Sequence, residues 1–387
     1  MDRMDIAIVG AGPAGSRAAW RLARAGARVT LFDGSHPREK PCGGGVTGRA
    51  LELLGNAIDS PALAAALIQS ATFERGPDRA QMRIEQPPDA SPHLVVTSRA
   101  RFDAALLAAA IDAGATFVPE RITHVSRADG GWQVTTRHGA AHAAWVLGAD
   151  GPNSLVRKRV SRPFDRADLS IATGFFVHGV TSRDISIGFE DNPAGYLWSF
   201  PRPDHLAVGV CAQADVSSPS MLASIASSWI ARNVASGPAG PTLERYSWPI
   251  PSLRESTLRL EQPAGTGWLL LGDAGGMVDP ITREGIFFAL SSADAAAECL
   301  VEDRDPAVAY VARIRRSIYD ELVRAARLKA SFFRPRFTGL LIRALEKSPG
   351  IRSVMLDLIA GRQPYRGLRR RLLATMELGL MVKMLRQ

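Results

Sequence analysis

Apolar residues in the first part of the chain follow two periods. A continuous apolar run over residues 6–9 predicts a buried parallel strand, and the segment 16–25 that follows a glycine turn predicts a helix. A second buried strand is expected over 28–32. The same alternation predicts further strands over 116–118, 144–148 and 267–271 and helices over 104–113 and 286–300. Strands that alternate with helices are typical of an α/β protein with a mostly parallel sheet.

The middle of the chain changes to a shorter period. Residues 171–212 consist of short β runs, alternating stretches occur within 71–97, and residues 122–136 predict a hairpin-like meander. From residue 306 onward the pattern is amphipathic and helical. We expect one long helix over 310–333, followed by shorter helices because Pro335, Pro349 and Pro364 interrupt the pattern.

These changes of period predict a discontinuous nucleotide-binding domain, an inserted α+β substrate domain with a mostly antiparallel sheet, and a C-terminal helical region. The expected boundaries are 1–70, 98–160 and 265–305 for the first, 71–97 and 161–264 for the second, and 306–387 for the third.

The turn after the first strand has the spacing of a dinucleotide-binding loop. Gly10 allows the tight turn, Gly12 lets the backbone approach a pyrophosphate, and Gly15 lets the helix pack on the strand. Pro13 and Ala14 complete the loop, whose helix N-terminus would face the anion. A glycine-rich turn that binds nothing is the alternative interpretation.

An acidic residue ends the second strand, about twenty residues after the loop. The Asp33 carboxylate would accept hydrogen bonds from a ribose diol and repel a 2′-phosphate. This disfavours NADP in the site and leaves FAD or NAD.

Two later acidic turns also follow buried strands. Asp150 precedes Gly151, and Asp273 follows Gly272. Ligands of open α/β sheets bind at the carboxyl ends of strands, so we expect the Asp150 turn to lie beside the first glycine loop. Ser154 is expected to cap the helix that follows.

Two further segments each allow two interpretations. Gly43 and Gly44 follow Cys42 in a loop that either lies close against a flat ligand or is a flexible connector. Tyr196, Trp198 and Phe200 share one face of a strand, where three rings line an apolar pocket or fill a core.

Composition places the chain among ordinary globular proteins, with 46% hydrophobic and 22% charged residues over 387 positions. We find no leader and no apolar run of eighteen residues, and therefore expect a protein that is neither secreted nor membrane-spanning. The three cysteines, Cys42, Cys211 and Cys299, show no metal-like spacing, so we expect no metal site and a reducing cytoplasm.

Positive charge is concentrated at the end of the chain. Residues 334–387 contain twelve Lys and Arg against three Asp and Glu, an excess equal to the whole net charge of +9. Such basic amphipathic helices can lie on an anionic membrane surface, or can simply be solvated faces of a domain. The tail lacks interleaved aromatic residues, so we do not expect nucleic acid as a partner.

Taken together, the first glycine loop with Asp33, the Gly148–Gly151 segment and Gly272–Asp273 resemble the FAD-dependent oxidoreductases of the hydroxylase-like fold over residues 4–300. Residues 41–45 and the Tyr196-x-Trp198-x-Phe200-Pro201 element resemble the geranylgeranyl reductase branch, whose members saturate prenyl double bonds with reduced flavin. Two positions depart from that branch, because Gly275 replaces an alanine and Arg283 replaces a glycine.

The resemblance implies a Rossmann-like FAD-binding domain and assigns roles to single residues. Asp33, Arg99 and the first glycine loop would hold the adenosine and pyrophosphate, and Asp273 the ribityl chain or pyrophosphate. The backbone of Gly285 and Ile286 would meet the flavin pyrimidine, with the helix N-terminus stabilising negative charge on the reduced ring. Cys42 would lie near the isoalloxazine and assist proton delivery, or be a small residue that fits a tight loop.

The chemistry expected from the resemblance is reduction of a C=C bond in a hydrophobic, prenyl-like substrate inside a pocket lined by Tyr196, Trp198 and Phe200. The electron donor would be NAD(P)H or ferredoxin, and the cytoplasmic enzyme could be peripheral to the inner face of the membrane. The alternative is a flavin-dependent monooxygenase or halogenase that acts on an aromatic or natural product through a flavin hydroperoxide. A flavin-binding protein without turnover is a third interpretation.

Overall fold

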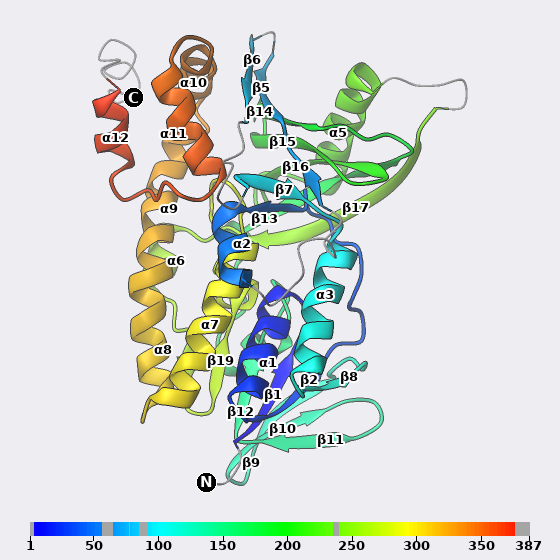
Figure 1. The fold of residues 1–387 in the computed structure, drawn as a ribbon, viewed down its shortest axis with the longest axis vertical. Coiled ribbons are helices and arrows are strands. Elements are labelled where there is room, and N and C mark those ends of the chain that lie inside the picture. Colours follow the sequence, from blue (N-terminus) through cyan, green and yellow to red (C-terminus); the bar gives the residue numbers. More distant parts are fainter. Residues whose placement is uncertain (1–3, 56–64, 77, 85–91, 235–239, 376–387) are drawn as a thin grey trace.

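The computed structural model describes residues 4–55, 65–76, 78–84, 92–234 and 240–375. Figure 1 shows an α/β unit at one end, a large sheet above it, and C-terminal helices along one side. None of the helices in these described ranges is both long and apolar enough to cross a bilayer.

The α/β unit is built on a six-stranded sheet, parallel except at β18. Its strand order is β18 (Ala264–Gly265), β19 (Trp268–Leu270), β12 (Trp145–Gly148), β1 (Asp5–Val9), β2 (Arg28–Phe32) and β8 (Thr116–Val118). Side chains alternate across β1: Ile6 and Ile8 pack toward the helices, and Ala7 and Val9 toward a second sheet. Both faces of the central strand are therefore buried.

Helices cover one face of this sheet and a small antiparallel sheet covers the other. The helices are α1 (Pro13–Arg24), α3 (Arg99–Asp112) and α7 (Ile286–Glu302), and α1 packs against both of the others. The second layer consists of β9 (His124–Ala128), β10 (Gly131–Thr135) and β11 (Ala140–Ala143). The predicted meander over 122–136 is confirmed by the β9–β10 hairpin.

Two predicted helix starts are too late, by three and by five residues. Helix α1 begins at Pro13 rather than residue 16, because Gly12 is its N-cap and proline suits the first helical position. Helix α3 begins at Arg99 rather than residue 104, because the Ser98 hydroxyl accepts the Arg101 N–H and caps it. Helix α4 (Leu155–Val160) begins after Ser154, whose hydroxyl accepts the Arg157 N–H as predicted.

The large sheet has seven strands and confirms the predicted β character of the middle segment. Its order is β17 (Thr242–Pro251), β13 (Leu169–His178), β16 (His205–Gln213), β15 (Ala194–Pro201), β14 (Asp184–Asp191), β5 (Ser70–Arg75) and β6 (Asp78–Arg83). All neighbours are antiparallel except β14 and β5. Strands β5 and β6 come from the earlier segment 71–97, which supports the proposed assignment of that segment to the substrate domain.

Period two along β15 and β16 separates two cores. Leu197, Val208 and Val210 pack under α5 (Pro219–Asn233), whereas Trp198 and Cys211 face the opposite side with Tyr246. A third, small sheet lies between the two larger units (Figure 1). Its strand order is β3 (Gly45–Thr47), β7 (Leu94–Val96) and β4 (Ala66–Leu67). Helix α2 (Gly48–Leu54) follows β3 in the chain.

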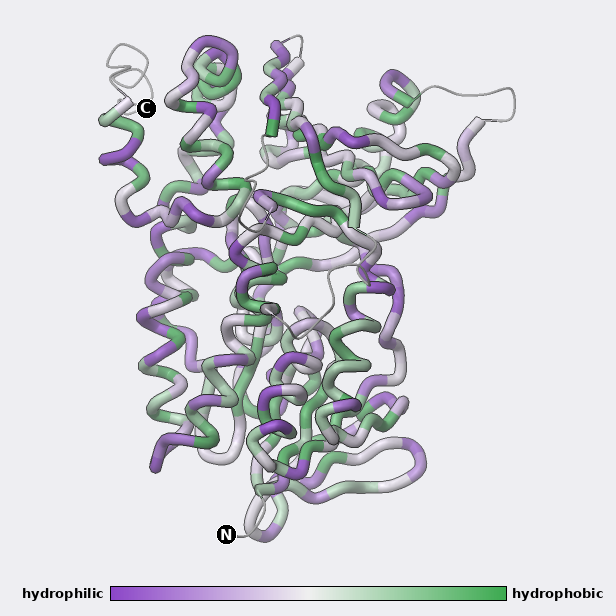
Figure 2. Tube along the Cα trace, viewed as in Figure 1, coloured by the Kyte–Doolittle hydropathy of each residue, from purple (hydrophilic) through white to green (hydrophobic). Residues whose placement is uncertain are grey.

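The C-terminal region begins with the long helix expected from the sequence. It starts at Pro306, and a π-helical turn over Arg315–Tyr319 joins α8 (Pro306–Ile314) to α9 (Asp320–Phe332). Figure 2 shows hydrophilic residues along the outer side of this helix. Helices α10 (Pro335–Lys347), α11 (Pro349–Ile359) and α12 (Leu368–Ala374) follow.

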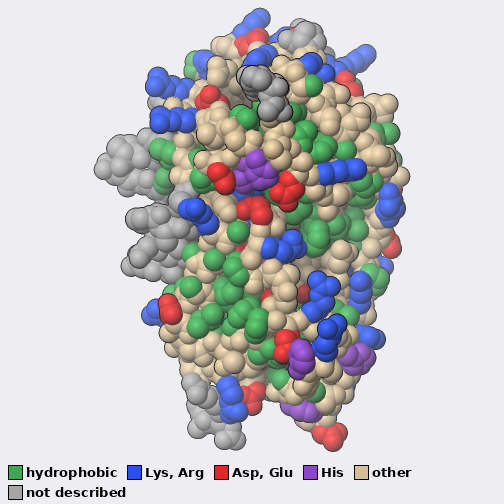
Figure 3. All heavy atoms as spheres, turned by 90° about the vertical axis from the view of Figure 1, so that its right-hand side faces the viewer, with side chains coloured by type: hydrophobic (Ala, Val, Ile, Leu, Met, Phe, Trp, Pro, Cys, Tyr) green, Lys and Arg blue, Asp and Glu red, His purple; other side chains and the backbone are tan. Residues whose placement is uncertain are grey.

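Helix α10 packs its apolar side against β5 and β6 rather than leaving it free. Leu341, Ile342 and Leu345 are buried there, together with Ile351 of α11. On the face drawn in Figure 3, the basic and acidic side chains of the described residues are interspersed among apolar ones.

Candidate functional site

The first glycine loop forms a cradle at the carboxyl end of β1. A Cβ on Gly10 would lie 2.4 Å from the Ala149 carbonyl oxygen, and one on Gly15 would lie 1.8 Å from the Gly10 carbonyl oxygen. Gly10 also has a φ of +102°, which favours glycine. The predicted proximity of the Asp150 turn is confirmed, because the Gly10 position would also meet the Asp150 Cα at 2.8 Å.

Two basic side chains lie close to the backbone at Gly12. The nearest heavy atoms to a Cβ at this position would be His36 Nε2 and Lys40 Nζ, each at 3.7 Å. The backbone amides at the start of α1 and these two side chains therefore surround one space. That combination suits an anion such as a pyrophosphate.

Asp33 lies beside this cradle at the end of β2. Its Oδ2 accepts the Ala11 N–H (2.9 Å), and its Oδ1 accepts the Ser35 N–H (2.7 Å). His36 Nδ1 lies 2.7 Å from Oδ2. Burial by itself would raise the pKa of Asp33, but His36 and the backbone donors lower it far below its usual value. From the sequence we expected the Asp33 carboxylate to accept hydrogen bonds from a ribose diol. Protein donors already occupy part of this carboxylate, so the ribose contact stays a prediction.

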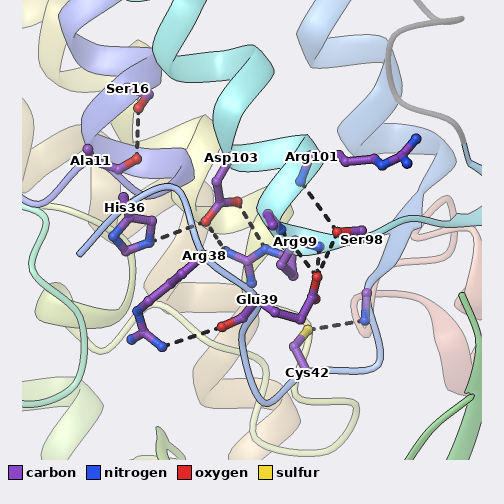
Figure 4. A network of polar contacts seen from close by, with 12 residues as sticks. Ala11, Ser16, His36, Arg38, Glu39, Cys42, Ser98, Arg99, Arg101 and Asp103 are labelled. Atoms are coloured by element: carbon purple, nitrogen blue, oxygen red, sulfur yellow. Dashed lines mark hydrogen bonds and ion pairs between the residues drawn. The ribbon is translucent and has the colours of Figure 1, made fainter. Parts of the chain in front are cut away.

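A buried network joins the cradle to helix α3 (Figure 4). Asp103 accepts two hydrogen bonds from Arg99, both 3.0 Å long, and its Oδ2 lies 3.3 Å from His36 Nε2. The imidazole of His36 is 7% exposed and bridges the two carboxylates of Asp33 and Asp103. Arg99, expected to contact the cofactor phosphates, lines the cavity but directs its fork at Asp103. Its phosphate contact stays a prediction.

Lys40 and Asp273 provide opposite charges near the same cradle. Among the described residues, neither forms an ion pair with a neighbour. Burial, followed by repulsion from Arg99, lowers the pKa of Lys40. Burial raises the pKa of Asp273, and the nearby charges of Lys40 and Arg99 oppose that shift. Both residues line the cavity, so a bound pyrophosphate and ribityl chain could use them as partners.

The remaining predicted binding positions lie around the same space. Asp150 Oδ2 accepts the N–H of Leu155 at 2.6 Å and so caps α4, while burial raises the pKa of this carboxyl. Gly272 has a φ of +51° in the 3₁₀ turn η4 (Gly272–Gly275), and the Gly272 N–H donates to Ser292. Gly285 is the N-cap of α7, whose first turn from Ile286 has no side-chain cap or acidic residue. Within the described part of the chain no side chain caps this first turn, so a ligand could accept hydrogen bonds from its N–H groups.

Gly43 and Gly44 are explained by protein packing, so the loop is not a flexible connector. A Cβ on Gly43 would lie 2.7 Å from the Phe200 ring, and one on Gly44 would lie 2.6 Å from Arg202 Cζ. Cys42 Sγ accepts the Gly44 N–H at 3.3 Å. The glycines line the cavity as well, but the residues that require them are Phe200 and Arg202.

Arg202 is fully buried at the end of β15 and fixes this loop. Its guanidinium donates to the carbonyls of Cys42 (2.6 Å), Gly43 (3.1 Å) and Thr97 (2.7 Å), and forms an ion pair with Glu39 at 2.6 Å. Burial opposes ionisation of Glu39, but Arg202, Ser98 and the first amides of α3 lower its pKa. We call Arg202, Glu39 and the carbonyls of Cys42, Gly43 and Thr97 the loop clamp.

One continuous cavity of about 1120 Å³ connects the cradle to an apolar chamber. A pocket for one drug-sized ligand measures about 300–1,000 Å³, so this space exceeds the size of a single ligand site. Tyr196, Trp198 and Phe200 all line this cavity, and Trp198 also belongs to a buried core. The aromatic face therefore both lines an apolar pocket and fills part of a core. The Tyr196 hydroxyl donates to the Thr282 carbonyl at 2.9 Å.

The comparisons with known proteins agree with this geometry. A family model described as an FAD binding domain matches residues 3–247. The geranylgeranyl diphosphate reductase of Rhodobacter capsulatus is 30% identical over 317 residues, which is 76% of this chain and 74% of that protein. The chain belongs to the geranylgeranyl reductase family of FAD-dependent oxidoreductases.

Solved structures support the same fold. A geranylgeranyl bacteriochlorophyll reductase-like protein from Thermoplasma acidophilum superposes with a TM-score of 0.77 at 21% identity, covering 97% of this chain and 100% of its own. A flavin-dependent brominase superposes with a TM-score of 0.70 at 20% identity, covering 96% and 98%. At such identities the likeness shows the fold alone, and it fits the predicted Rossmann-like unit with its β-rich insertion and helical end.

The cradle fits FAD by its own chemistry. The cavity-lining backbone at Gly12, two basic side chains and a helix terminus without a side-chain cap are the groups that a dinucleotide with a flavin would need. The sequence pattern did not single out His36, Lys40, Glu39, Asp103 and Arg202. The first three lie in the glycine and proline loop after Asp33, where charged residues could have been a signal, whereas nothing linked Arg202 to that loop.

We predict that Lys40→Ala weakens FAD binding about tenfold or more, because it removes the ammonium that faces Gly12 and a charge-assisted hydrogen bond contributes about 1.5–3 kcal/mol. Titration of the apoprotein with FAD measures the dissociation constant. Cys42→Ser, two positions away in the same loop, is the matched control and should bind FAD normally. Equal affinity in the Lys40 variant and the wild type would contradict this role.

We predict that Arg202→Met destabilises the protein strongly, because it leaves Glu39 and three carbonyls without their donor. Removing one partner of a buried pair costs about 3–5 kcal/mol, and we expect the lower end because Glu39 is 25% exposed. The free energy of unfolding in urea measures the loss. Arg75→Met breaks the more exposed pair with Asp191 and should cost less than about 1 kcal/mol. Similar decreases in the free energy of unfolding for Arg202→Met and Arg75→Met would contradict a larger contribution of the loop clamp to stability.

Proposed function

We propose that the enzyme reduces C=C bonds of a prenyl or other hydrophobic substrate with electrons from bound FAD. Reduced FAD would supply a hydride to one alkene carbon, and the other carbon would receive a proton. The observation that carries the proposal is the continuity of the cavity, which leads from the cradle into an apolar chamber.

The walls of that chamber suit a long apolar chain. Strands β5 and β14 contribute Phe73, Ile185 and Ile187, and helices α10 and α11 contribute side chains that face the same space. The helical lining consists of Phe337, Leu341, Ile351, Val354, Met355, Leu358 and Ile359. Burial of such a chain is favourable by about 25 cal/mol per Å² of apolar surface, which supports binding without polar contacts along its length.

Two residues are candidates for delivering the proton. Tyr196 donates its hydroxyl to Thr282, and burial raises its pKa well above the usual value. Cys42 lines the cavity beside Arg99, and we propose it as the proton donor. Tyr196 would instead form part of the cavity wall together with Trp198. The electron source, NAD(P)H or ferredoxin, stays a prediction.

The sequence predicted membrane contact from the amphipathic, basic C-terminal helices, and the structure changes which of these helices could make that contact. The apolar faces of α10 and α11 pack inside the protein, so they are not available to a bilayer. Helix α12 has no buried residue and carries Arg369, Arg370 and Arg371. Arg371 pairs with Asp357 and Arg369 lines the cavity, so within α12 we limit the proposed membrane contact to Arg370. Glu377, Lys383 and Arg386 lie outside the described residues.

An anaerobic experiment tests the reductase proposal. The FAD-loaded protein is reduced with dithionite and mixed with geranylgeraniol. We expect the absorbance of oxidised flavin to return, and the product to gain two hydrogens for each bond reduced. The competing proposal is oxygen chemistry, favoured by the fold likeness to a brominase. No reaction with the alkene, combined with an absorbance band that forms with oxygen and decays only on adding an aromatic substrate, would support it.

We predict that Met355→Trp shortens the chamber and changes the preference for chain length. Met355 lines the cavity and is half-buried, so a larger ring fills space without overpacking a closed core. The kcat/KM for a twenty-carbon prenyl alcohol should fall about tenfold or more, while that for a ten-carbon alcohol changes little. Val301→Trp, at a side chain that is 54% exposed in α7, is the control. An equal decrease for both alcohols would contradict this path.

A further inference from the structure

Tyr365 connects the C-terminal helices to the loop that leads into α7. It lies between α11 and α12 and lines the cavity, and its hydroxyl donates to Asp279 Oδ1 at 3.1 Å, across 86 residues of sequence. Burial, followed by the Asp279 carboxylate, raises the pKa of Tyr365 well above its usual value, so the phenol stays protonated and acts as the donor. Neither the proposed reduction nor the loop clamp uses this contact.

Asp279 organises the segment over residues 279–285, which we call the α7 loop. The side chain of Asp279 is buried, and its Oδ1 atom also accepts the N–H groups of Ile281 (2.7 Å) and Thr282 (2.9 Å). One carboxylate oxygen therefore serves two backbone donors of the loop and the phenol from the C-terminal region. The loop ends at the N-cap of α7.

The backbone of the α7 loop is strained and is closed by the same residue. Arg283 has a φ of +60° and is the one non-glycine residue with positive φ in the described ranges. The Arg283 N–H donates to the Asp279 carbonyl, and the Asp279 N–H donates to the Glu284 carbonyl, both at 3.0 Å. A strained backbone persists where its surroundings fix it, so the contacts of Asp279 help to fix where the loop ends and α7 begins.

Three other elements hold the α7 loop. From β3 the Thr47 hydroxyl donates to Glu284 Oε1 at 2.6 Å, and from α2 Arg49 pairs with the same carboxylate. From β15 the Tyr196 hydroxyl donates to the Thr282 carbonyl at 2.9 Å. Because these anchors are independent of Tyr365, loss of the phenol would shift the loop rather than unfold it.

The segment that carries Tyr365 is itself fixed to neighbouring elements. The Tyr365 N–H donates to Glu321 of α9. The Arg49 N–H donates to the Ala360 carbonyl at 3.3 Å, and a Cβ on Gly361 would lie 2.3 Å from Arg49 Nε. A phenol that is held in this way can set the position of its acceptor instead of following it.

The first turn of α7 is where the flavin pyrimidine is expected from the sequence. A helix N-terminus carries partial positive charge, and this turn contains no acidic residue and no side-chain cap within the described part of the chain. Flavin gains negative charge at its pyrimidine edge when it is reduced, and positive charge placed there stabilises the reduced form. The position of this turn therefore affects the reduction potential of bound FAD.

We propose that Tyr365 is a positioning residue for the flavin: through Asp279 it holds the α7 loop, and with it the first turn of α7, against the pyrimidine edge. This role concerns the affinity and the reduction potential of FAD. It applies equally to alkene reduction and to oxygen chemistry, so it goes beyond the proposed function and does not depend on it.

Tyr365→Phe tests this role, because the substitution removes the hydroxyl and keeps the ring that lines the cavity. We expect the affinity for reduced FAD, relative to that for oxidised FAD, to fall about three- to tenfold. For a two-electron couple this change lowers the reduction potential by about 15–30 mV. The potential is measured anaerobically in FAD-loaded protein against a reference dye. Where a variant does not retain FAD, the dissociation constants of the oxidised and reduced coenzyme give the same ratio.

Tyr310→Phe is the matched control. Tyr310 is fully buried in α8, outside the cavity lining, and its hydroxyl donates to the Leu270 carbonyl at 3.0 Å. Both variants lose one hydroxyl hydrogen bond, so the unfolding midpoints of the two apoproteins should decrease by similar amounts. The potential should decrease in Tyr365→Phe and stay unchanged in Tyr310→Phe.

A double variant tests whether Tyr365 acts through Asp279. In an Asp279→Ala background the acceptor is already absent, so adding Tyr365→Phe should change the potential by much less than it does in the wild type. A full shift in that background, an unchanged potential in Tyr365→Phe, or an equal shift in Tyr310→Phe would each overturn the assignment. Reoxidation by the alkene is measured separately: an enzyme that reduces geranylgeraniol while Tyr365→Phe leaves its potential unchanged would keep the proposed function and lose this role of Tyr365.

Discussion

The loop clamp is the interaction on which the site depends. A single buried guanidinium, Arg202, comes from the large sheet and holds the loop of Cys42 through its carbonyls. Glu39 joins the same arginine to the first turn of α3. One ion pair therefore ties together three segments that are distant in sequence. Such a pair fixes the positions of these segments more than it adds to the free energy of folding, because the cost of burying two charges offsets much of their attraction.

The cavity has an electrostatic division that follows from this arrangement. Toward the first glycine loop, acids and bases alternate in a connected network around His36 and Asp103 (Figure 4). Toward the C-terminal helices most of the lining is apolar, and Arg283, Arg324, Arg327 and Arg369 also line the cavity there. The fold is shared with a flavin-dependent brominase, so the fold alone does not determine what the chain binds.

The C-terminal helices illustrate how tertiary packing changes the meaning of an amphipathic pattern. The same Leu and Ile spacing that suits a bilayer also suits the side of a β-sheet. In α10 it is used for the sheet, since Leu341 and Ile342 pack with strand residues such as Phe73 and Met82. The helices consequently form one wall of the chamber, which Arg369 of α12 also lines.

The sequence by itself determined the α/β unit, the glycine cradle and the order of the elements. These depend on local period and on short spacings, such as Gly10 to Gly15 and the distance to Asp33, which the chain carries within a few residues. Helix starts were misjudged at Pro13 and Arg99 because capping by Gly12 and Ser98 overrode the hydrophobic pattern. Only the tertiary structure decided that Gly43 and Gly44 are required by Phe200 and Arg202 and that Lys40 lies close to Gly12. It also decided that Arg283 Nε and Nη1 have no acceptor among the described residues. Those facts depend on contacts between residues far apart in the chain, for which hydrophobic period and spacing contain no signal.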